Sequence, residues 1–164
     1  MSQKKKFVKL AKAEATANSL YLWGGQGEEV EKTPPEIIQK METSNENAAR
    51  VLKCLAGKIN AGLNMKKAKY FDCSGLVVYL LMQLNVIDQD YTAQGIYTNL
   101  CVPVLRTDLK EGDLCFISSG TKITHVGIYV ADNLVVEAAG RDLGIVQRGI
   151  SKNKWNLYGR VKGL

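Results

Sequence analysis

The chain lacks the features that would place it in several common protein classes. Its four cysteines form no Cys-X-X-Cys pair and it has one histidine, so the usual structural zinc patterns are excluded and we expect no metal. No apolar run approaches the roughly eighteen residues of a membrane span. It also has no internal repeat and no low-complexity tract.

A secretory signal is missing as well. The basic start, Lys4 to Lys6, is followed by residues 7–14, where charged side chains interrupt every apolar stretch. We therefore expect a chain made in the cytoplasm without a signal peptide. If it acts outside the cell that makes it, something else must release it.

Composition fits an ordinary globular protein. The 164 residues suffice for one domain with its own core, and 46% are hydrophobic and 23% charged. The net charge of +6 favours polyanionic surroundings: nucleic acid, anionic lipid or an anionic cell-wall polymer. The basic residues are dispersed and no aromatic stripe accompanies them, so we expect no nucleic acid partner. Free thiols are the default for the four cysteines.

The amino-terminal half reads as helices. A helix is expected over residues 4–19, ending before the glycine pair at 24–25. The polar stretch that follows holds two further helices, one opened by Pro34-Pro35 and one capped by Ser44 or Asn45. Because its apolar content is too small for a separate core, we expect a helical insertion at about 28–66 in a single domain of residues 1–164.

The carboxy-terminal half changes to strands. A helix is predicted from Cys73 to about Leu84 and a shorter one over Thr92–Leu100. Short β-favouring runs separated by turn residues follow at 114–117, 126–130, 134–138, 145–148 and 158–161. This order predicts an α+β fold in which an antiparallel sheet packs against the helix that begins near Cys73.

The tetrapeptide Asp72-Cys73-Ser74-Gly75 is the first candidate for chemistry. It precedes an apolar helix, so Cys73 lies in the first turn, where free N–H groups and the helix dipole favour a thiolate. The polar neighbours suggest a sulfur at the edge of the core facing a cleft. The other three cysteines read as small buried hydrophobes.

The single histidine, His125, is the second candidate. Alternation places it on the same sheet face as Gly127 and Tyr129. In an antiparallel hairpin turning near 131–133, position 125 would lie roughly opposite 137 or 139, so that Glu137 could hold one imidazole nitrogen. Nucleophile, base and orienting carboxylate would then be present. A structural histidine and a solvated Glu137 are the simpler alternatives.

Four segments resemble the signature segments of the NlpC/p60 cysteine peptidases, in the family's order. They are Tyr21-Leu22-Trp23-Gly24-Gly25, Asp72-Cys73-Ser74-Gly75-Leu76-Val77, Glu111-Gly112-Asp113-Leu114-Cys115-Phe116 and His125-Val126-Gly127-Ile128-Tyr129. The resemblance implies a papain-like core with the nucleophile helix packed on an antiparallel sheet. It also implies hydrolysis of amide bonds in peptidoglycan stem peptides, typically between γ-linked D-glutamate and the following diamino acid.

The resemblance also implies roles for individual residues. Cys73 would be the nucleophile, His125 the base and Glu137 the third polar residue, with no metal or organic cofactor needed. The residues that would bind substrate in the cleft are Tyr21, Trp23, Asp72 and Ser74.

Two departures from the family pattern matter. A carboxylate is unusual at the third position, although it would still favour an imidazolium. Nearly fifty residues separate Gly25 from Cys73, far more than the family usually needs. The surplus would either roof the cleft or support the fold.

These observations predict a cell-wall hydrolase acting on the peptidoglycan stem peptide, with an anionic cell-wall polymer as a second partner. A phage endolysin or tail-associated lysin fits, reaching the wall after release or as part of a particle. A cytoplasmic enzyme that recycles wall peptides, or an exported toxin, stays open. So do an acyltransferase using the same Cys/His pair and a catalytically inactive wall-binding module.

Overall fold

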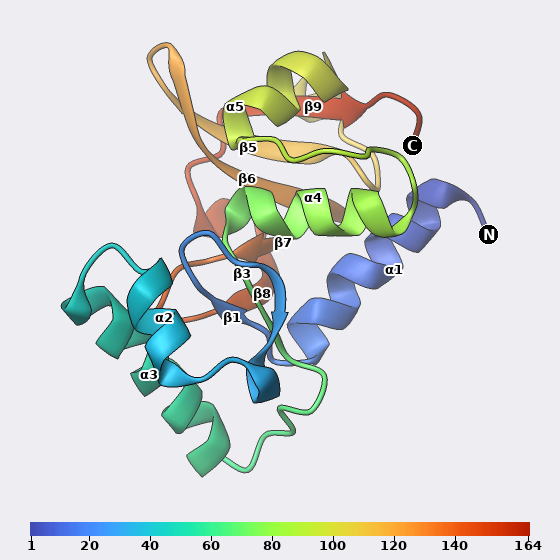
Figure 1. The fold of residues 1–164 in the computed structure, drawn as a ribbon. Helices are drawn as coiled ribbons and strands as arrows, with labels where there is room; N and C mark the ends of the chain where they lie inside the picture. Colours follow the sequence, from blue (N-terminus) through green and yellow to red (C-terminus); the bar gives the residue numbers. More distant parts are fainter.

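The computed structural model describes residues 1–164 and is built around a six-stranded antiparallel sheet (Figure 1). The strands follow one another in the order β4-β9-β5-β6-β7-β8. Their bounds are β4 Cys101–Pro103, β5 Leu114–Ser119, β6 Lys122–Ala131, β7 Leu134–Ala138, β8 Ile145–Gly149 and β9 Leu157–Val161. Helices packed on one antiparallel sheet confirm the predicted α+β fold.

Helices α1 (Gln3–Thr16) and α4 (Cys73–Gln83) pack on this large sheet, chiefly against β6, β7 and β8. The middle of α4 is apolar, and Leu76, Val77, Val78, Leu80 and Leu81 are buried there. An all-apolar helix needs cover on more than one side. The large sheet covers one side of α4 and a second, small sheet covers another.

This small sheet was not predicted. It consists of β1 (Leu20–Tyr21), β2 (Gln26–Glu29) and β3 (Lys69–Phe71), in the order β1-β3-β2. β3 runs parallel to β1 and antiparallel to β2. Strands of two to four residues are too short to show alternation in sequence. Since β3 leads directly into α4, the small sheet determines where α4 begins.

The polar stretch of residues 28–66, here called the α2–α3 segment, folds as expected into helices. It holds a 3-10 turn (Val30–Lys32), α2 (Pro35–Met41) and α3 (Asn45–Asn60). Ser44 caps α3, its hydroxyl accepting a hydrogen bond from the N–H of Asn47. Apolar side chains of the segment are buried with Leu20, Leu22 and Tyr70 of the neighbouring elements. Figure 1 shows both helices beside β1, away from β9.

The remaining elements are short. α5 (Ala93–Gly95) continues into a π-helical turn (Ile96–Leu100), which confirms the helix predicted near Thr92–Leu100. Two 3-10 turns occupy Arg106–Asp108 and Ile150–Lys152. None of the helices combines the length and apolar character that crossing a bilayer requires.

Candidate active site

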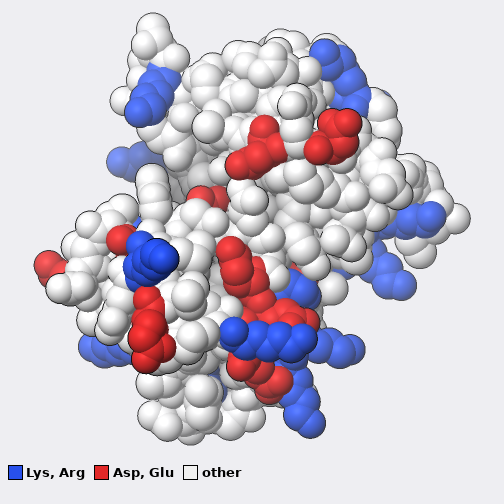
Figure 2. All heavy atoms as spheres, in the orientation of Figure 1, with Lys and Arg blue, Asp and Glu red and all other residues white.

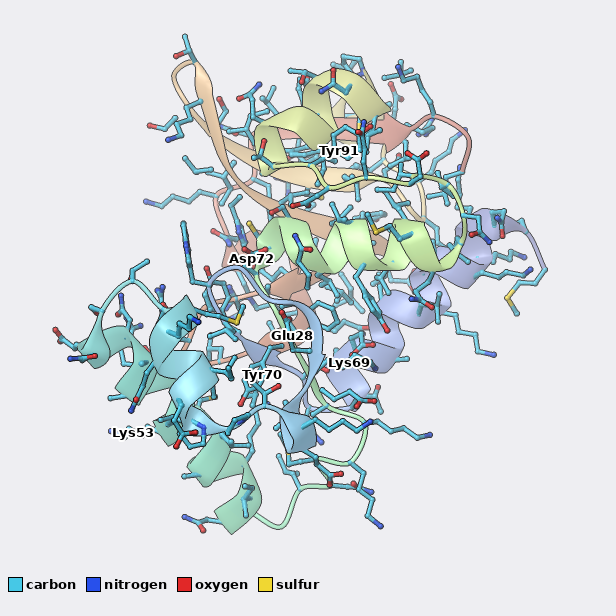
Figure 3. The ribbon with its side chains drawn as sticks, viewed as in Figure 1. Glu28, Lys53, Lys69, Tyr70, Asp72 and Tyr91 are labelled. Atoms are coloured by element: carbon cyan, nitrogen blue, oxygen red, sulfur yellow. The ribbon has the colours of Figure 1, made fainter.

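Cys73 is the first residue of α4, and Asp72 is its N-cap. The Asp72 carboxylate accepts hydrogen bonds from the N–H of Gly75 at 2.7 Å and of Gly24 at 3.0 Å. In return, the Asp72 N–H donates to the Gly25 carbonyl at 3.0 Å. A Cβ at position 75 would collide with that carbonyl oxygen, so glycine is required there. The turn at residues 23–25 is thereby docked on the start of α4, where Figure 3 labels Asp72.

The tip of α4 also offers donors. The Gly75 N–H is held by Asp72, and the Leu76 N–H donates to the Asp72 carbonyl. The N–H groups of Cys73 and Ser74 have no acceptor within the helix, as at any helix start. Such groups beside a sulfur can stabilise a negatively charged oxygen on a carbonyl that the sulfur attacks.

His125 on β6 and Glu137 on β7 form a hydrogen-bonded pair. The distance from His125 Nε2 to Glu137 Oε1 is 3.0 Å. The strand register sets Gly127 opposite Glu137, so Glu137 meets His125 diagonally. Continued by two residues, this register sets position 139, the second of the two predicted partners, opposite position 125. The predicted side-chain contact between His125 and Glu137 is present.

Glu137 is almost fully buried, with 1% of its surface exposed. Besides His125, it accepts hydrogen bonds from Arg148 Nε at 3.0 Å and Asn153 Nδ2 at 2.9 Å. Burial alone would raise the pKa of this carboxyl, but these three donors outweigh burial and hold the pKa below its usual range. The solvated-acid reading of Glu137 is thus wrong.

Trp155 stacks on the imidazole of His125. The ring centroids are 5.2 Å apart and the planes differ by 14°. Gly127 makes room for the indole, because a Cβ there would meet Trp155 at 2.8 Å. Neither Trp155 nor the Glu137 partners Arg148 and Asn153 were found from the sequence. Of these three residues, only Arg148 left a signal in the sequence, because a basic residue in the strand next to Glu137 is a candidate partner for its carboxylate.

Cys73 and His125 line one cleft of about 450 Å³. The other predicted residues in its lining are Tyr21, Trp23, Asp72 and Ser74, and the lining is completed by Thr92, Ala93 and residues 122–124. An adjoining cavity of about 260 Å³ shares Tyr21 and His125 and includes Glu137. The structure thus brings all the predicted site residues together. The face drawn in Figure 2 is indented between the part built on α4 and the part formed by the α2–α3 segment.

Burial and hydrogen bonding act in opposite directions on His125. Burial lowers its pKa, but interaction with the neighbouring Cys73 sulfur and with the hydrogen-bonded Glu137 carboxylate outweighs burial and raises the pKa to about 9. Because Glu137 occupies Nε2, Nδ1 is the nitrogen left for the sulfur of Cys73. An imidazolium beside this sulfur is therefore favoured at neutral pH.

The other three cysteines lie in different surroundings. Burial raises the pKa of Cys54, and it raises the pKa of Cys101 and of Cys115 to about 12. A cavity of about 580 Å³ next to α3 contains Cys54, but its lining has no histidine. All four cysteines are free thiols in the structure. Only Cys73 combines a helix start, a cleft and a histidine.

Residues 55–160 match the model of the NlpC/P60 family. The chain belongs to the NlpC/P60 family. The match contains the Asp72, Glu111 and His125 segments, whereas Tyr21 to Gly25 lie outside it. Their place beside the helix start therefore comes from the structure.

Two curated relatives are similar over 54% of this chain. One is murein DD-endopeptidase MepH from Escherichia coli (strain K12), 34% identical over 91 residues, and the other is the probable endopeptidase p60 from Listeria grayi, 32% identical over 88 residues. The matched regions span 34% and 16% of these relatives, so each contains a long part without a counterpart here.

Solved structures share the fold. The NlpC/p60 domain of the peptidoglycan hydrolase SagA has a TM-score of 0.60 at 16% identity, covering 96% of this chain and 98% of its own. RipD from Mycobacterium tuberculosis, described as a non-catalytic NlpC/p60 protein adapted to peptidoglycan binding, has a TM-score of 0.63 at 15% identity, covering 100% and 99%. The fold thus occurs in catalytic and non-catalytic proteins, and the site must decide between them.

Proposed function

We propose that this chain is a cysteine peptidase that cleaves an amide bond in peptidoglycan stem peptides. The observation that carries the proposal is that Cys73, at the start of α4, and His125, hydrogen-bonded to the buried Glu137, line the same cleft. A non-catalytic binding module would have no need of a cysteine facing an imidazole that a buried carboxylate holds. Membership of a peptidoglycan hydrolase family supports the substrate.

The mechanism follows from the arrangement. The Cys73 sulfur attacks the scissile carbonyl, and the N–H groups of Cys73 and Ser74 stabilise the resulting oxyanion. The imidazolium of His125 gives its proton to the leaving amine, and a thioester to Cys73 remains. His125 then takes a proton from water, which attacks the thioester and restores the thiolate and imidazolium pair. Glu137 keeps the imidazole oriented in both steps.

The cleft residues fit a peptide with a polar end. Burial raises the pKa of Tyr21 to about 12, so its hydroxyl stays a neutral hydrogen-bond donor at the cleft wall. Both Asp72 oxygens accept backbone N–H groups, Oδ1 also accepts a hydrogen bond from the Ser74 hydroxyl at 3.4 Å, and Trp23 lines the same cleft. We propose that these four side chains bind the part of the stem peptide before the scissile bond.

Two bonds are candidates. The family resemblance favours the bond between γ-linked D-glutamate and the diamino acid. The name of the E. coli relative, a murein DD-endopeptidase, favours instead an amide bond that joins two D-configured residues. We propose the γ-D-glutamyl bond as the first candidate. The phage lysin setting and the anionic wall polymer stay predictions from the sequence.

The test is a digest of purified peptidoglycan and of a synthetic stem tripeptide, with fragments identified by mass spectrometry. Cleavage of the tripeptide after D-glutamate supports the proposal, and release of only cross-link fragments would move the activity to the DD bond. Cys73→Ala is the control, and it should fold normally and release no fragment. Transfer of the acyl group to an added amine in place of water would identify an acyltransferase.

A further inference from the structure

A buried ion pair joins the α2–α3 segment to the loop that follows Glu137. Glu42 lies between α2 and α3, and its side chain has no exposed surface. Its carboxylate accepts two hydrogen bonds from the Arg141 guanidinium, from Nε at 2.9 Å and from Nη2 at 2.7 Å. Such bidentate pairs are strong and geometrically specific. The pair connects residues 99 positions apart in the chain.

The same carboxylate holds the cleft wall. The Trp23 N–H donates to Glu42 at 3.1 Å, and the Thr43 N–H donates at 3.0 Å. With both oxygens occupied twice, the Glu42 carboxylate has little freedom to move. The indole of Trp23 lines the cleft and is 53% exposed. Glu42 therefore fixes the backbone that carries an exposed aromatic side chain at the substrate face.

Arg141 lies next to the cleft, in the lining of the adjoining cavity. Its guanidinium lies 5.2 Å from the ring centre of Tyr21 and lines the cavity that contains His125 and Glu137. Glu42 occupies the Nε–Nη2 edge of the guanidinium, so this edge is unavailable to a substrate carboxylate. Arg141 thus links Tyr21, Glu42 and the β7–β8 loop (residues 139–144).

A second contact between the same parts provides a comparison. Arg50 of α3 donates to Asp142, the next loop residue, at 2.8 Å. The side chains of this pair are 45% and 67% exposed, whereas those of Arg141 and Glu42 are 16% and 0% exposed. Exposed pairs contribute little to stability, but removing one partner of a buried pair leaves an uncompensated charge. The two pairs have the same chemistry and differ in burial.

We propose that the Glu42–Arg141 pair is a positioning device through which the α2–α3 segment supports the substrate-binding wall from behind. It holds Trp23 in the lining of the cleft and the β7–β8 loop in the lining of the adjoining cavity that contains His125 and Glu137. Cys73, His125 and Glu137 are held by separate contacts, so the pair sets the affinity for the peptide and leaves the chemical step intact. This inference rests on the proposed function.

The expected result for Glu42→Gln is a KM for the stem peptide raised about 10–100-fold with kcat changed less than about threefold, because displaced binding residues weaken substrate positioning. An amide in place of the carboxylate puts an N–H group against one of the backbone donors. Arg141→Lys should give an intermediate KM, since a lysine keeps the charge without the fork. The matched controls Arg50→Met and Asp142→Asn should stay within about twofold of the unmodified chain.

Folding is checked in two ways. The double variant Glu42→Met with Arg141→Met removes both charges, and it should fold and still show the raised KM. Amide hydrogen exchange is compared between Glu42→Gln and the unmodified chain. The Trp23 N–H and the amides of residues 139–144 should exchange faster in Glu42→Gln than in the unmodified chain. An unchanged KM in folded Glu42→Gln, or an equal rise in the controls, overturns the inference.

The exchange measurement needs no turnover, so the two proposals can fail separately. If the unmodified chain cleaves no stem peptide, the proposed function fails, and the dissociation constant of the same peptide, measured by calorimetry, replaces KM. A dissociation constant unchanged by Glu42→Gln, or absence of binding by the unmodified chain, overturns the inference as well.

Discussion

Replacing Glu137 by glutamine removes one charge from the site while keeping the size of the side chain. In the structure this carboxylate accepts three hydrogen bonds, from His125, Arg148 and Asn153. Its charge is one of the causes that raise the pKa of His125 to about 9. Without it, burial and the influence of Cys73 oppose each other, and we take the ordinary imidazole value of about 6.5 as the expectation.

The size of the effect follows from these two values. At pH 7.5 an imidazole with a pKa of about 9 is about 97% protonated, and one with a pKa of about 6.5 is about 9% protonated. Loss of the imidazolium alone therefore lowers kcat/KM about tenfold. Loss of orientation adds to this, so we expect a total loss of roughly 10–1,000-fold for Glu137→Gln and for Glu137→Ala.

The pH profile separates the two contributions. Near pH 5.5 the variant imidazole is again about 90% protonated, so the loss due to protonation disappears and the loss due to orientation stays. The assay is kcat/KM for a stem peptide between pH 5 and 10, with Asp142→Asn as the control for an exposed carboxylate. An alkaline limb at the same pH in Glu137→Gln and the unmodified chain would refute the assigned cause of the His125 shift.

Three further predictions concern the support of the site. Trp155→Leu should lower the free energy of unfolding by about 2–4 kcal/mol, because a buried indole is lost. It should also lower kcat, because the His125 ring loses its stacking surface. Thermal unfolding and steady-state kinetics measure the two effects. Gly75→Ala should lower the free energy of unfolding by about 1–3 kcal/mol, because its Cβ would collide with the Gly25 carbonyl. Gly57→Ala on α3, where nothing lies within 4 Å, should raise it by about 0.5–1 kcal/mol. Denaturant titration measures both values, and a Gly75→Ala variant more stable than Gly57→Ala would contradict the argument. Because the pKa of His125 is raised on folding, protonation of His125 contributes its full stabilisation below about pH 6.5 and loses it as the pH rises through about 9. The melting temperature of the unmodified chain should therefore fall more over this window than that of His125→Gln. A parallel decline of the two melting temperatures would contradict this.

Local patterns predicted the parts of this site that depend on local structure. The helix that begins at Cys73 and the hairpin that carries His125 each leave a signal within a dozen residues, whereas the capping role of Asp72 came from the structure. The strand register followed as well, because a turn at 131–133 implies the observed pairing of Gly127 with Glu137. The bulge between Tyr129 and Ala131 alters only the pairing next to the turn.

The rest of the site depends on contacts between distant positions. Glu42 meets Arg141 across 99 residues, and Trp155 reaches His125 from a loop after β8. No periodicity connects such residues, since their contact results from how whole elements pack. Of the two roles first considered for residues 28–66, a roof would place their side chains in the cleft lining, and none of them lies there. The segment lies behind the wall that carries Trp23.

The most direct test of the central claim is the rate at which iodoacetamide alkylates each cysteine at pH 6–8, followed by mass spectrometry of the tryptic peptides. Cys73 should react at least tenfold faster than Cys54, Cys101 and Cys115, and His125→Ala should remove that advantage. Equal reactivity of all four thiols, or a fast Cys73 that is indifferent to the loss of His125, would contradict a catalytic pair.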